Sequence, residues 1–250
     1  MFHVQVDQRK TQTQESPFPM KAEARQNLIT YFVFLVIALI GIYYGRKISN
    51  DHSFLRVWDF SNLLLMAIGI PFLFLQSGAR LPEFWSKTIS TRARFLIPLA
   101  IGIVFGVFDV FVIKIIMHPE PYQELPPFLQ PFPYSLFLYF SGALEVEVFY
   151  RLIPLTIMLY AGNWFKGGKY YNAFFWTAVV LTSLREPIEQ LPEGNALLIA
   201  YSIFTGFLMN FIQAVTYKNA GFIASLSVRL GHYLIWHIIL GIYVQYFELV

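Results

Sequence analysis

The sequence predicts an all-α fold, a polytopic membrane bundle of about seven transmembrane helices, with eight as the alternative. The first observation is composition: of 250 residues, 56% are hydrophobic and only 13% are charged, whereas soluble domains carry about 25% charged residues. The second is that the apolar residues, with 26 Phe and 15 Tyr among them, gather into successive long runs. A helix needs about 20 mostly apolar residues to cross a bilayer. We therefore expect an integral membrane protein in contact with the lipid bilayer.

The first three apolar runs predict ordinary spanning helices. A polar tail, residues 1–26, precedes the first run, which ends at Arg46-Lys47. No short apolar region with a small-residue cleavage site follows the tail, so we expect a retained helix and not a signal peptide. The three expected spans are 27–45, 60–79 and 95–117.

The next two runs are less regular. The fourth is long and contains Pro154, and a proline removes one backbone hydrogen bond and kinks a helix. This run predicts either one broken helix or a re-entrant piece followed by a span. The fifth is short, and Pro187 disfavours helical geometry at Glu186. With two further runs, the expected spans are 134–162, 172–184, 195–217 and 221–247.

The distribution of basic residues predicts the orientation. With seven spans, most Lys and Arg fall on the same side as the N terminus. The positive-inside rule then places the N terminus in the cytoplasm. We expect the membrane to be a plasma (inner) membrane. Segment 118–133 is rich in proline and lacks Lys and Arg, which predicts a stiff external loop. We expect a cytoplasmic tail, residues 1–26, and a single membrane domain, residues 27–250.

Composition also excludes several kinds of function. The chain has no cysteine, which excludes disulfides, iron–sulfur clusters, thiolate metal sites and a cysteine nucleophile. The net charge of +3 comes from basic residues scattered singly between apolar runs, so we expect no nucleic-acid partner. The sequence leaves the oligomeric state open.

The stretch EVEVFYR places charged residues inside the fourth apolar run. Glu147 and Arg151 are four residues apart and share one face of a regular helix, so they are expected to form an ion pair. Glu145 lies about 200° around the helix from Glu147. The two carboxylates therefore point to nearly opposite sides and do not form an obvious acid/base pair. Charged groups at such depth are costly, and they are usually paired, hydrated or functional.

Other apolar runs carry polar residues too. Asp109 needs a partner, for which we expect an arginine from another helix, while Lys114 extends toward the end of its own helix. At the end of the fifth run, Arg185 or Glu186 is expected either to face solvent or to turn into the same cavity as Glu147. In the last run, one helical stripe holds Ser225, Arg229, His232 and Trp236, and His237 lies off it by about 140°.

The order and spacing of these groups resemble the CPBP family, also called the CAAX-protease or Abi family of intramembrane proteases, over roughly residues 95–245. The family motif E-E-x-x-x-R is matched by Glu147 and Arg151, with Val146 in place of the first glutamate. The motif F-x-x-x-H is nearest to 181–185, where Arg185 replaces the histidine. In the third motif, H-x-x-x-N or H-x-x-x-D, Arg229 stands where the histidine is expected, and His232 is the closest histidine.

The resemblance implies an intramembrane protease that cleaves a peptide bond of a membrane protein or peptide with an activated water. Glu147 or Glu145 would be the base, and His232 an oxyanion donor or metal ligand. A metal version needs three protein ligands, for which Glu147, Glu186 and His232 are the candidates and zinc the candidate ion. His237 is a further candidate binding residue.

Two other functions remain as alternatives. The first is a non-catalytic scaffold in which Arg151, Arg185 and Arg229 form a cationic pocket for an anionic peptide tail or lipid head group. The second is a small-solute transporter in which Asp109, Glu147 and the histidines relay protons, although the internal repeat common in transporters is not visible.

Overall fold

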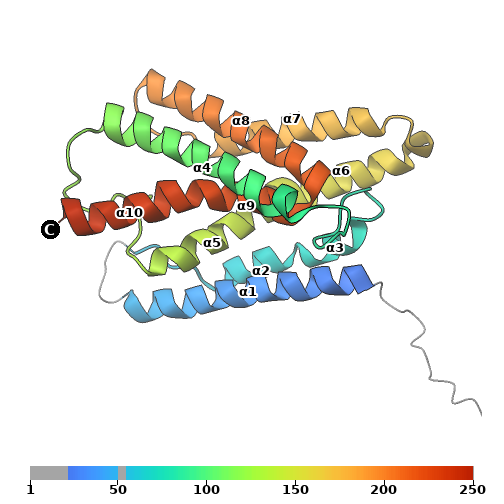
Figure 1. Cartoon of the computed structure of the whole chain (residues 1–250), viewed down its shortest axis with the longest axis horizontal. Helices are drawn as coiled ribbons and strands as arrows, with labels where there is room; N and C mark the ends of the chain where they lie inside the picture. The colour runs from blue at the N-terminus through green and yellow to red at the C-terminus, as the bar shows by residue number, and fades with distance from the viewer. Residues whose placement is uncertain (1–21, 50–54, 250) are drawn as a thin grey trace, which may run out of the picture.

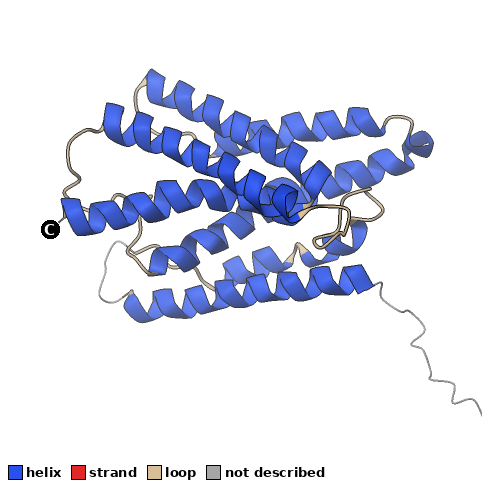
Figure 2. Ribbon diagram, viewed as in Figure 1, coloured by secondary structure: helices blue, strands red, loops and turns tan. Residues whose placement is uncertain are grey.

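Residues 22–49 and 55–249 are described by a computed structural model, and their regular structure is helical (Figure 2). Seven helices result when adjoining segments are joined. The α-helical segments are α1 (Ala22–Ile48), α2 (Phe60–Ala67), α3 (Ile70–Leu75), α4 (Ile97–Asp109), α5 (Tyr134–Glu147), α6 (Ile153–Trp164), α7 (Tyr171–Glu189), α8 (Ala196–Ala220), α9 (Phe222–Tyr233) and α10 (Leu240–Tyr243).

Short π-helical and 3₁₀ segments, whose backbone hydrogen bonds join residues five or three apart instead of four, extend these helices. The π-helical ones are η1 (Arg92–Leu96), η2 (Val110–Met117), η3 (Val148–Leu152), η5 (Leu234–Ile239) and η6 (Val244–Glu248), and η4 (Phe165–Gly168) is a 3₁₀ turn. The N-terminal residues 1–21, which hold most of the predicted tail, lie outside the described residues, and α1 itself already begins at Ala22.

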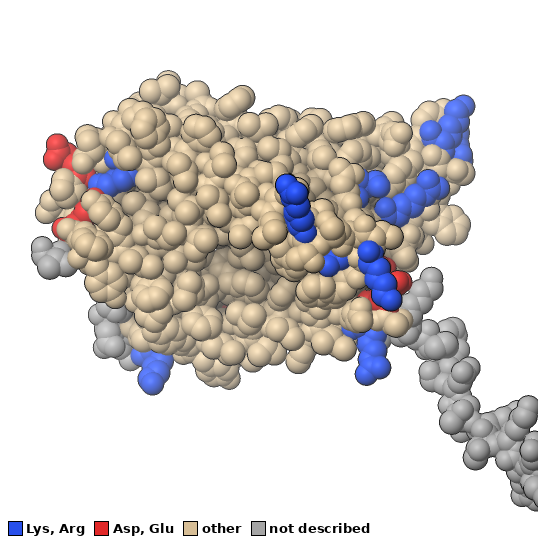
Figure 3. Space-filling model, viewed as in Figure 1, with Lys and Arg blue, Asp and Glu red and all other residues tan. Residues whose placement is uncertain are grey.

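Four helices are long and apolar enough to cross a membrane: Ala22–Ile48, Arg92–Met117, Ala196–Ala220 and Phe222–Glu248. Large apolar side chains such as Phe32, Phe108 and Phe204 are exposed on three of them, as a lipid-facing surface requires. Most of the visible Lys and Arg lie toward the end where α1 begins, and a broad band without charged side chains separates them from the smaller group of acidic and basic side chains at the other end (Figure 3). The predicted integral membrane character is thus supported by helix length and surface.

Local sequence explains where several helices begin and end. Asp59 caps α2 by accepting from the backbone N–H of Ser61 at 2.8 Å, and Asn195 caps α8 by accepting from Leu198 N–H at 2.9 Å. Gly221 separates α8 from α9 with a φ of 87°, a conformation that side-chain-bearing residues rarely adopt. This turn places α9 beside α8.

Helix α9 lies in the middle of the bundle (Figure 1). It packs against α4, α5 and α8, while α1 packs against α5, and α7 lies between α6 and α8. Nearly every residue of α9 from Phe222 to His232 is buried. The polar residues of this helix therefore face other helices and not lipid.

Three predicted segments differ from the structure in outline. The run 60–79 is split into α2 and α3, because Pro71 has no N–H for the Ala67 carbonyl; the Tyr31 hydroxyl donates to the nearby Met66 carbonyl at 2.6 Å. The run 134–162 forms one continuous helix through Pro154, with no re-entrant break. Helix α7 passes through Pro187 to Glu189 instead of ending at 184, so Glu186 lies within a helix.

Candidate functional site

Glu147, the last residue of α5, is fully buried and bound by groups from two other helices. Its carboxylate accepts from Ser225 Oγ of α9 at 2.5 Å and from Gln213 Nε2 of α8 at 2.5 Å. Its ion pair is with Arg229 of α9, whose Nε lies 3.6 Å from Oε1. Glu147 therefore ties α5 to α8 and α9.

We expected Glu147 to form an ion pair with Arg151, and this prediction is wrong: the ion-pair partner of Glu147 is Arg229. The segment between them, η3, is π-helical, and its i→i+5 bonding takes residues four apart out of line. Gln213 lies between the two groups: its amide donates to Glu147, and its Oε1 accepts from Arg151 Nη2 at 2.8 Å. Arg151 also donates to Asn210 Oδ1, and its nearest carboxylate is Glu186, at 3.8 Å.

Pro154 explains one more contact of Arg151. A proline cannot donate to the carbonyl four residues earlier, which here belongs to Tyr150. Arg151 Nη1 donates to that oxygen at 3.3 Å. The carbonyl that Pro154 leaves without its usual donor thus accepts from the buried guanidinium instead.

Glu186 of α7 and Arg229 of α9 form the strongest contact of the site. Arg229 Nη1 and Nη2 lie 2.6 Å from Glu186 Oε1 and Oε2, respectively, the parallel two-bond geometry that suits a guanidinium and a carboxylate. Both side chains are at least nine-tenths buried. Glu186 is therefore the residue of the fifth run that turns inward, one of the two alternatives expected.

Arg185 points elsewhere, and this removes the expected cationic pocket. It pairs with Glu189 at 2.7 Å near solvent, with 49% of its side chain exposed. Arg151 and Arg229 are matched by Glu147 and Glu186, so the inner cluster carries two charges of each sign. The three arginines do not converge on an unpaired anion site.

A second polar group lies near the C-terminal end of α9. His232 Nε2 is 2.6 Å from Asp109 Oδ2 of α4, and the Tyr201 hydroxyl of α8 donates to Asp109 Oδ1 at 2.8 Å. The expected partner of Asp109 was an arginine, and that expectation is wrong. Lys114, as expected, reaches the end of its helix, where it donates to the Glu120 carbonyl at 2.7 Å.

Close backbone packing brings Asp109 to His232. A Cβ on Gly102 of α4 would lie 1.9 Å from the Val228 carbonyl of α9, and one on Gly231 would lie 2.3 Å from the Leu99 carbonyl. Only glycine allows backbones to approach this closely. Asp109 lies about two turns beyond Gly102 on α4. His232 is the residue after Gly231 on α9.

The hydrogen bond to Asp109 fixes which nitrogen carries the proton in a neutral imidazole. A carboxylate accepts, so Nε2 carries the proton, and a neutral His232 then presents Nδ1 as an acceptor. Nδ1 is buried and has no hydrogen-bond partner within the described chain. A buried acceptor without a donor is costly, which marks a place for water or a ligand.

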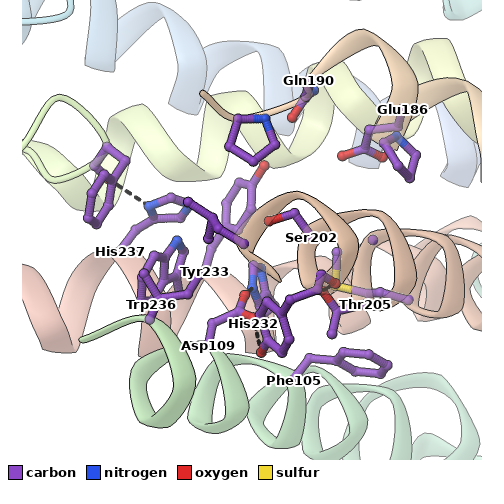
Figure 4. A pocket seen from close by; sticks show the side chains of 18 of the residues that line it. Phe105, Asp109, Glu186, Gln190, Ser202, Thr205, His232, Tyr233, Trp236 and His237 are labelled. Carbon is purple, nitrogen blue, oxygen red and sulfur yellow. Dashed lines mark hydrogen bonds and ion pairs between the residues drawn. The ribbon is translucent and has the colours of Figure 1, made fainter. Parts of the chain in front are cut away.

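His232 lines a cavity of about 550 Å³ between α4, α7, α8 and α9 (Figure 4). The cavity is lined by Glu186, Asn210 and Arg229 of the helices and by His118 and Tyr122 of the loop 118–133. Ser225, Arg229, His232 and Trp236 were predicted to share one stripe, and the last three do line this cavity.

The two glutamates expected to be catalytic do not line the cavity. Glu147 is fully buried, and its carboxylate accepts from Gln213 and Ser225. Glu145 faces away, beside Asn62 and Arg56, so the predicted opposite orientation of the two carboxylates is confirmed. Of the three residues predicted to be catalytic, His232 is the one at the cavity.

The proposed metal ligands do not converge either. Both oxygens of Glu186 are bound by Arg229, Glu147 is held by Gln213 and Ser225, and His232 by Asp109. Among the residues that the structure describes, no three His, Asp or Glu side chains are grouped so as to hold a metal ion. The residues present therefore do not fit a zinc centre.

His237 is a packing residue at the edge of the cavity. Its Nδ1 lies 2.7 Å from the Phe128 carbonyl, and its ring stacks on Tyr139 with centroids 4.2 Å apart. Its ring centroid is 6.2 Å from that of His232. Segment η5, which begins between the two histidines, sets this offset.

Several residues of the site were not singled out from the sequence. They are Asn210, Gln213 and Tyr201, all on α8. The available signal was a pair of amides three residues apart in an otherwise apolar run, a spacing that puts both on one helix face.

Comparison of the chain with known protein families, with curated proteins and with solved structures found no match.

Proposed function

We propose that this chain is a membrane-embedded hydrolase of the intramembrane-protease kind, in which His232, oriented by Asp109, is the base that activates the attacking nucleophile. One observation carries the proposal: the Asp109–His232 pair at 2.6 Å lines the cavity and leaves Nδ1 as an unpartnered buried acceptor. A positioned histidine of this kind contributes about 10²–10⁴-fold to a rate through proton transfer.

Asp109 and Tyr201 act on the imidazole and not on the substrate. Asp109 holds the proton on Nε2 and stabilises the imidazolium that forms when Nδ1 takes a proton. Tyr201 binds the second carboxylate oxygen, which fixes the orientation of Asp109. The base is thus prepared before a substrate arrives.

A peptide substrate is supported by the resemblance to the CPBP family. The residues lining the cavity run from Phe105 to His237, within the 95–245 range of the resemblance. The ionic cluster of Glu147, Arg151, Glu186 and Arg229 joins the motif-bearing helices α5–η3, α7 and α9. Two of its members, Glu186 and Arg229, also line the cavity. We further propose that all seven helices cross the membrane with the N terminus in the cytoplasm.

The test is cleavage of quenched-fluorescent transmembrane peptides by the full chain, purified in detergent. The wild-type protein is expected to cleave at least one member of the set, and Asp109→Asn to slow that cleavage at least 100-fold. Glu145→Gln is the matched control, since Glu145 faces away from the cavity, and it is expected to keep the wild-type rate. Equal rates for wild type and Asp109→Asn would contradict the proposed base.

A further inference from the structure

Ser202 of α8 differs from most hydroxyl groups inside this bundle. Ser141, Thr205 and Ser227 donate to the carbonyl four residues earlier, at 2.8, 2.9 and 2.8 Å, the usual solution for a hydroxyl on an apolar helix. Within the described chain, Ser202 makes no hydrogen bond, although it lines the cavity. An unbonded hydroxyl in such a place is available to water, to a substrate or to a neighbouring base.

Ser202 and His232 face the same space. They lie on the neighbouring helices α8 and α9, and Figure 4 shows both side chains in the cavity above the Asp109 contact. Tyr201, the residue before Ser202, is bonded to Asp109. The same turn of α8 therefore fixes the carboxylate and presents the serine.

The two groups also complement each other chemically. Ser202 has a proton to donate and no acceptor, whereas His232 Nδ1 is a buried acceptor without a donor. They are not hydrogen-bonded in the structure, and catalytic hydrogen bonds commonly tighten only when substrate is bound. A serine, a histidine and an orienting carboxylate are the parts of a nucleophilic triad, which is recognised by roles and not by chain order.

We infer that Ser202 is the nucleophile of this site, with His232 as its base and Asp109 as the positioning residue. This inference rests on the proposed hydrolase function. Ser202 Oγ forms a bond to the substrate carbonyl carbon while its proton moves to His232 Nδ1. That proton then passes to the departing amine or alcohol as the scissile bond breaks, leaving an ester on Ser202. Water attacks the ester, its proton goes to Nδ1, and Ser202 regains a proton from His232 as the acid is released.

The inference makes the substrate class more definite. A serine nucleophile acts on amides and esters through an acyl intermediate, so the site would accept carbonyl substrates of both kinds. It would also react with fluorophosphonates, which form a stable bond to an activated serine. Direct attack by water predicts no such reaction.

The experiment is fluorophosphonate labelling of the detergent-purified full chain, with the labelled peptide identified by mass spectrometry. The expected result is a single adduct on Ser202, absent in Ser202→Ala and at least 10-fold slower to form in His232→Ala. Thr205→Val is the matched control. Thr205 lines the same cavity one turn away, but its hydroxyl is already bonded to the Tyr201 carbonyl, so labelling should stay within about 3-fold of wild type.

Two results would overturn the inference. One is an adduct that survives in Ser202→Ala, which would place the nucleophile elsewhere. The other is peptide cleavage by Ser202→Ala at more than a third of the wild-type rate, which would leave water as the nucleophile and the proposed hydrolase intact. Labelling of Ser202 without cleavage of any peptide would instead support the nucleophile and count against peptides as substrates.

Discussion

Arg229 and Glu186 meet through two parallel contacts of 2.6 Å each, deep between α9 and α7. Each of these residues also faces a second ion of opposite sign: Arg229 lies 3.6 Å from Glu147, and Glu186 lies 3.8 Å from Arg151. Four charges thus alternate in sign within one buried cluster. The arrangement joins α5, η3, α7 and α9, and two of its members, Glu186 and Arg229, line the cavity.

Removing Glu186 is expected to destabilise the fold strongly. Glu186→Ala leaves Arg229 buried without its main partner, a loss of about 3–5 kcal/mol for buried pairs. Glu189→Ala is the matched control, because Glu189 pairs with Arg185 near solvent, where such pairs contribute about 1 kcal/mol or less. The measurement is the free energy of unfolding in mixed micelles. Equal losses for the two variants would contradict the account of the cluster.

Glu147→Ala is expected to lower the abundance of the protein in membranes more than Glu145→Ala does. The first change removes the acceptor of Ser225 and Gln213 and one ion partner of Arg229. The second affects a half-buried group beside Asn62. Quantitative immunoblotting of membrane fractions compares the two variants, and equal abundance would argue against the assigned partners of Glu147.

The close contact of α4 with α9 predicts a sharp difference between two glycine substitutions. Gly102→Ala places a Cβ 1.9 Å from the Val228 carbonyl, whereas the nearest atom to a Cβ at Gly142 is Trp58 Cζ2 at 3.7 Å. We expect Gly102→Ala to force the helices apart and lower both stability and cleavage. Gly142→Ala should be neutral or gain up to about 1 kcal/mol in helix propensity. Thermal unfolding of both variants is the measurement, and an unperturbed Gly102→Ala would contradict the packing.

The geometry predicts no stoichiometric zinc in the purified protein. Each of the candidate ligands, Glu147, Glu186 and His232, is already bonded to groups that are not arranged around a common point. Elemental analysis of the wild-type protein beside His232→Ala tests this. One zinc per chain, lost on substitution of His232, would show that the cavity rearranges into a metal site.

Much of the fold could be predicted from the sequence, since length and hydrophobicity decide where apolar helices form. The opposite orientation of Glu145 and Glu147 also followed from helical spacing, whereas spacing left open whether Glu186 faces solvent or the interior. The ion-pair and hydrogen-bond partners of these residues did not follow from spacing. Spacing rules assume a regular α-helix. In this chain, π-helical segments begin directly after Asp109, after Glu147 and after Tyr233. Such segments are frequent at functional sites and leave no periodic signature.

The Asp109–His232 pair was harder still to predict. The two residues are 123 positions apart, and their meeting depends on glycines in α4 and α9 that give little information about which helices pack together. Asp109 therefore appeared to need an arginine, the commonest partner of a buried carboxylate. Tertiary packing decides such pairings, and no local pattern contains it.

The most direct measurement is the rate of transmembrane-peptide cleavage by His232→Ala beside Glu147→Gln, each expressed per folded protein. We expect a fall of about 10²–10⁴-fold for His232→Ala and of less than about 10-fold for Glu147→Gln, because Glu147 supports the bundle and does not line the cavity. The reverse order, with Glu147→Gln inactive and His232→Ala active, would contradict the account and assign the base to Glu147.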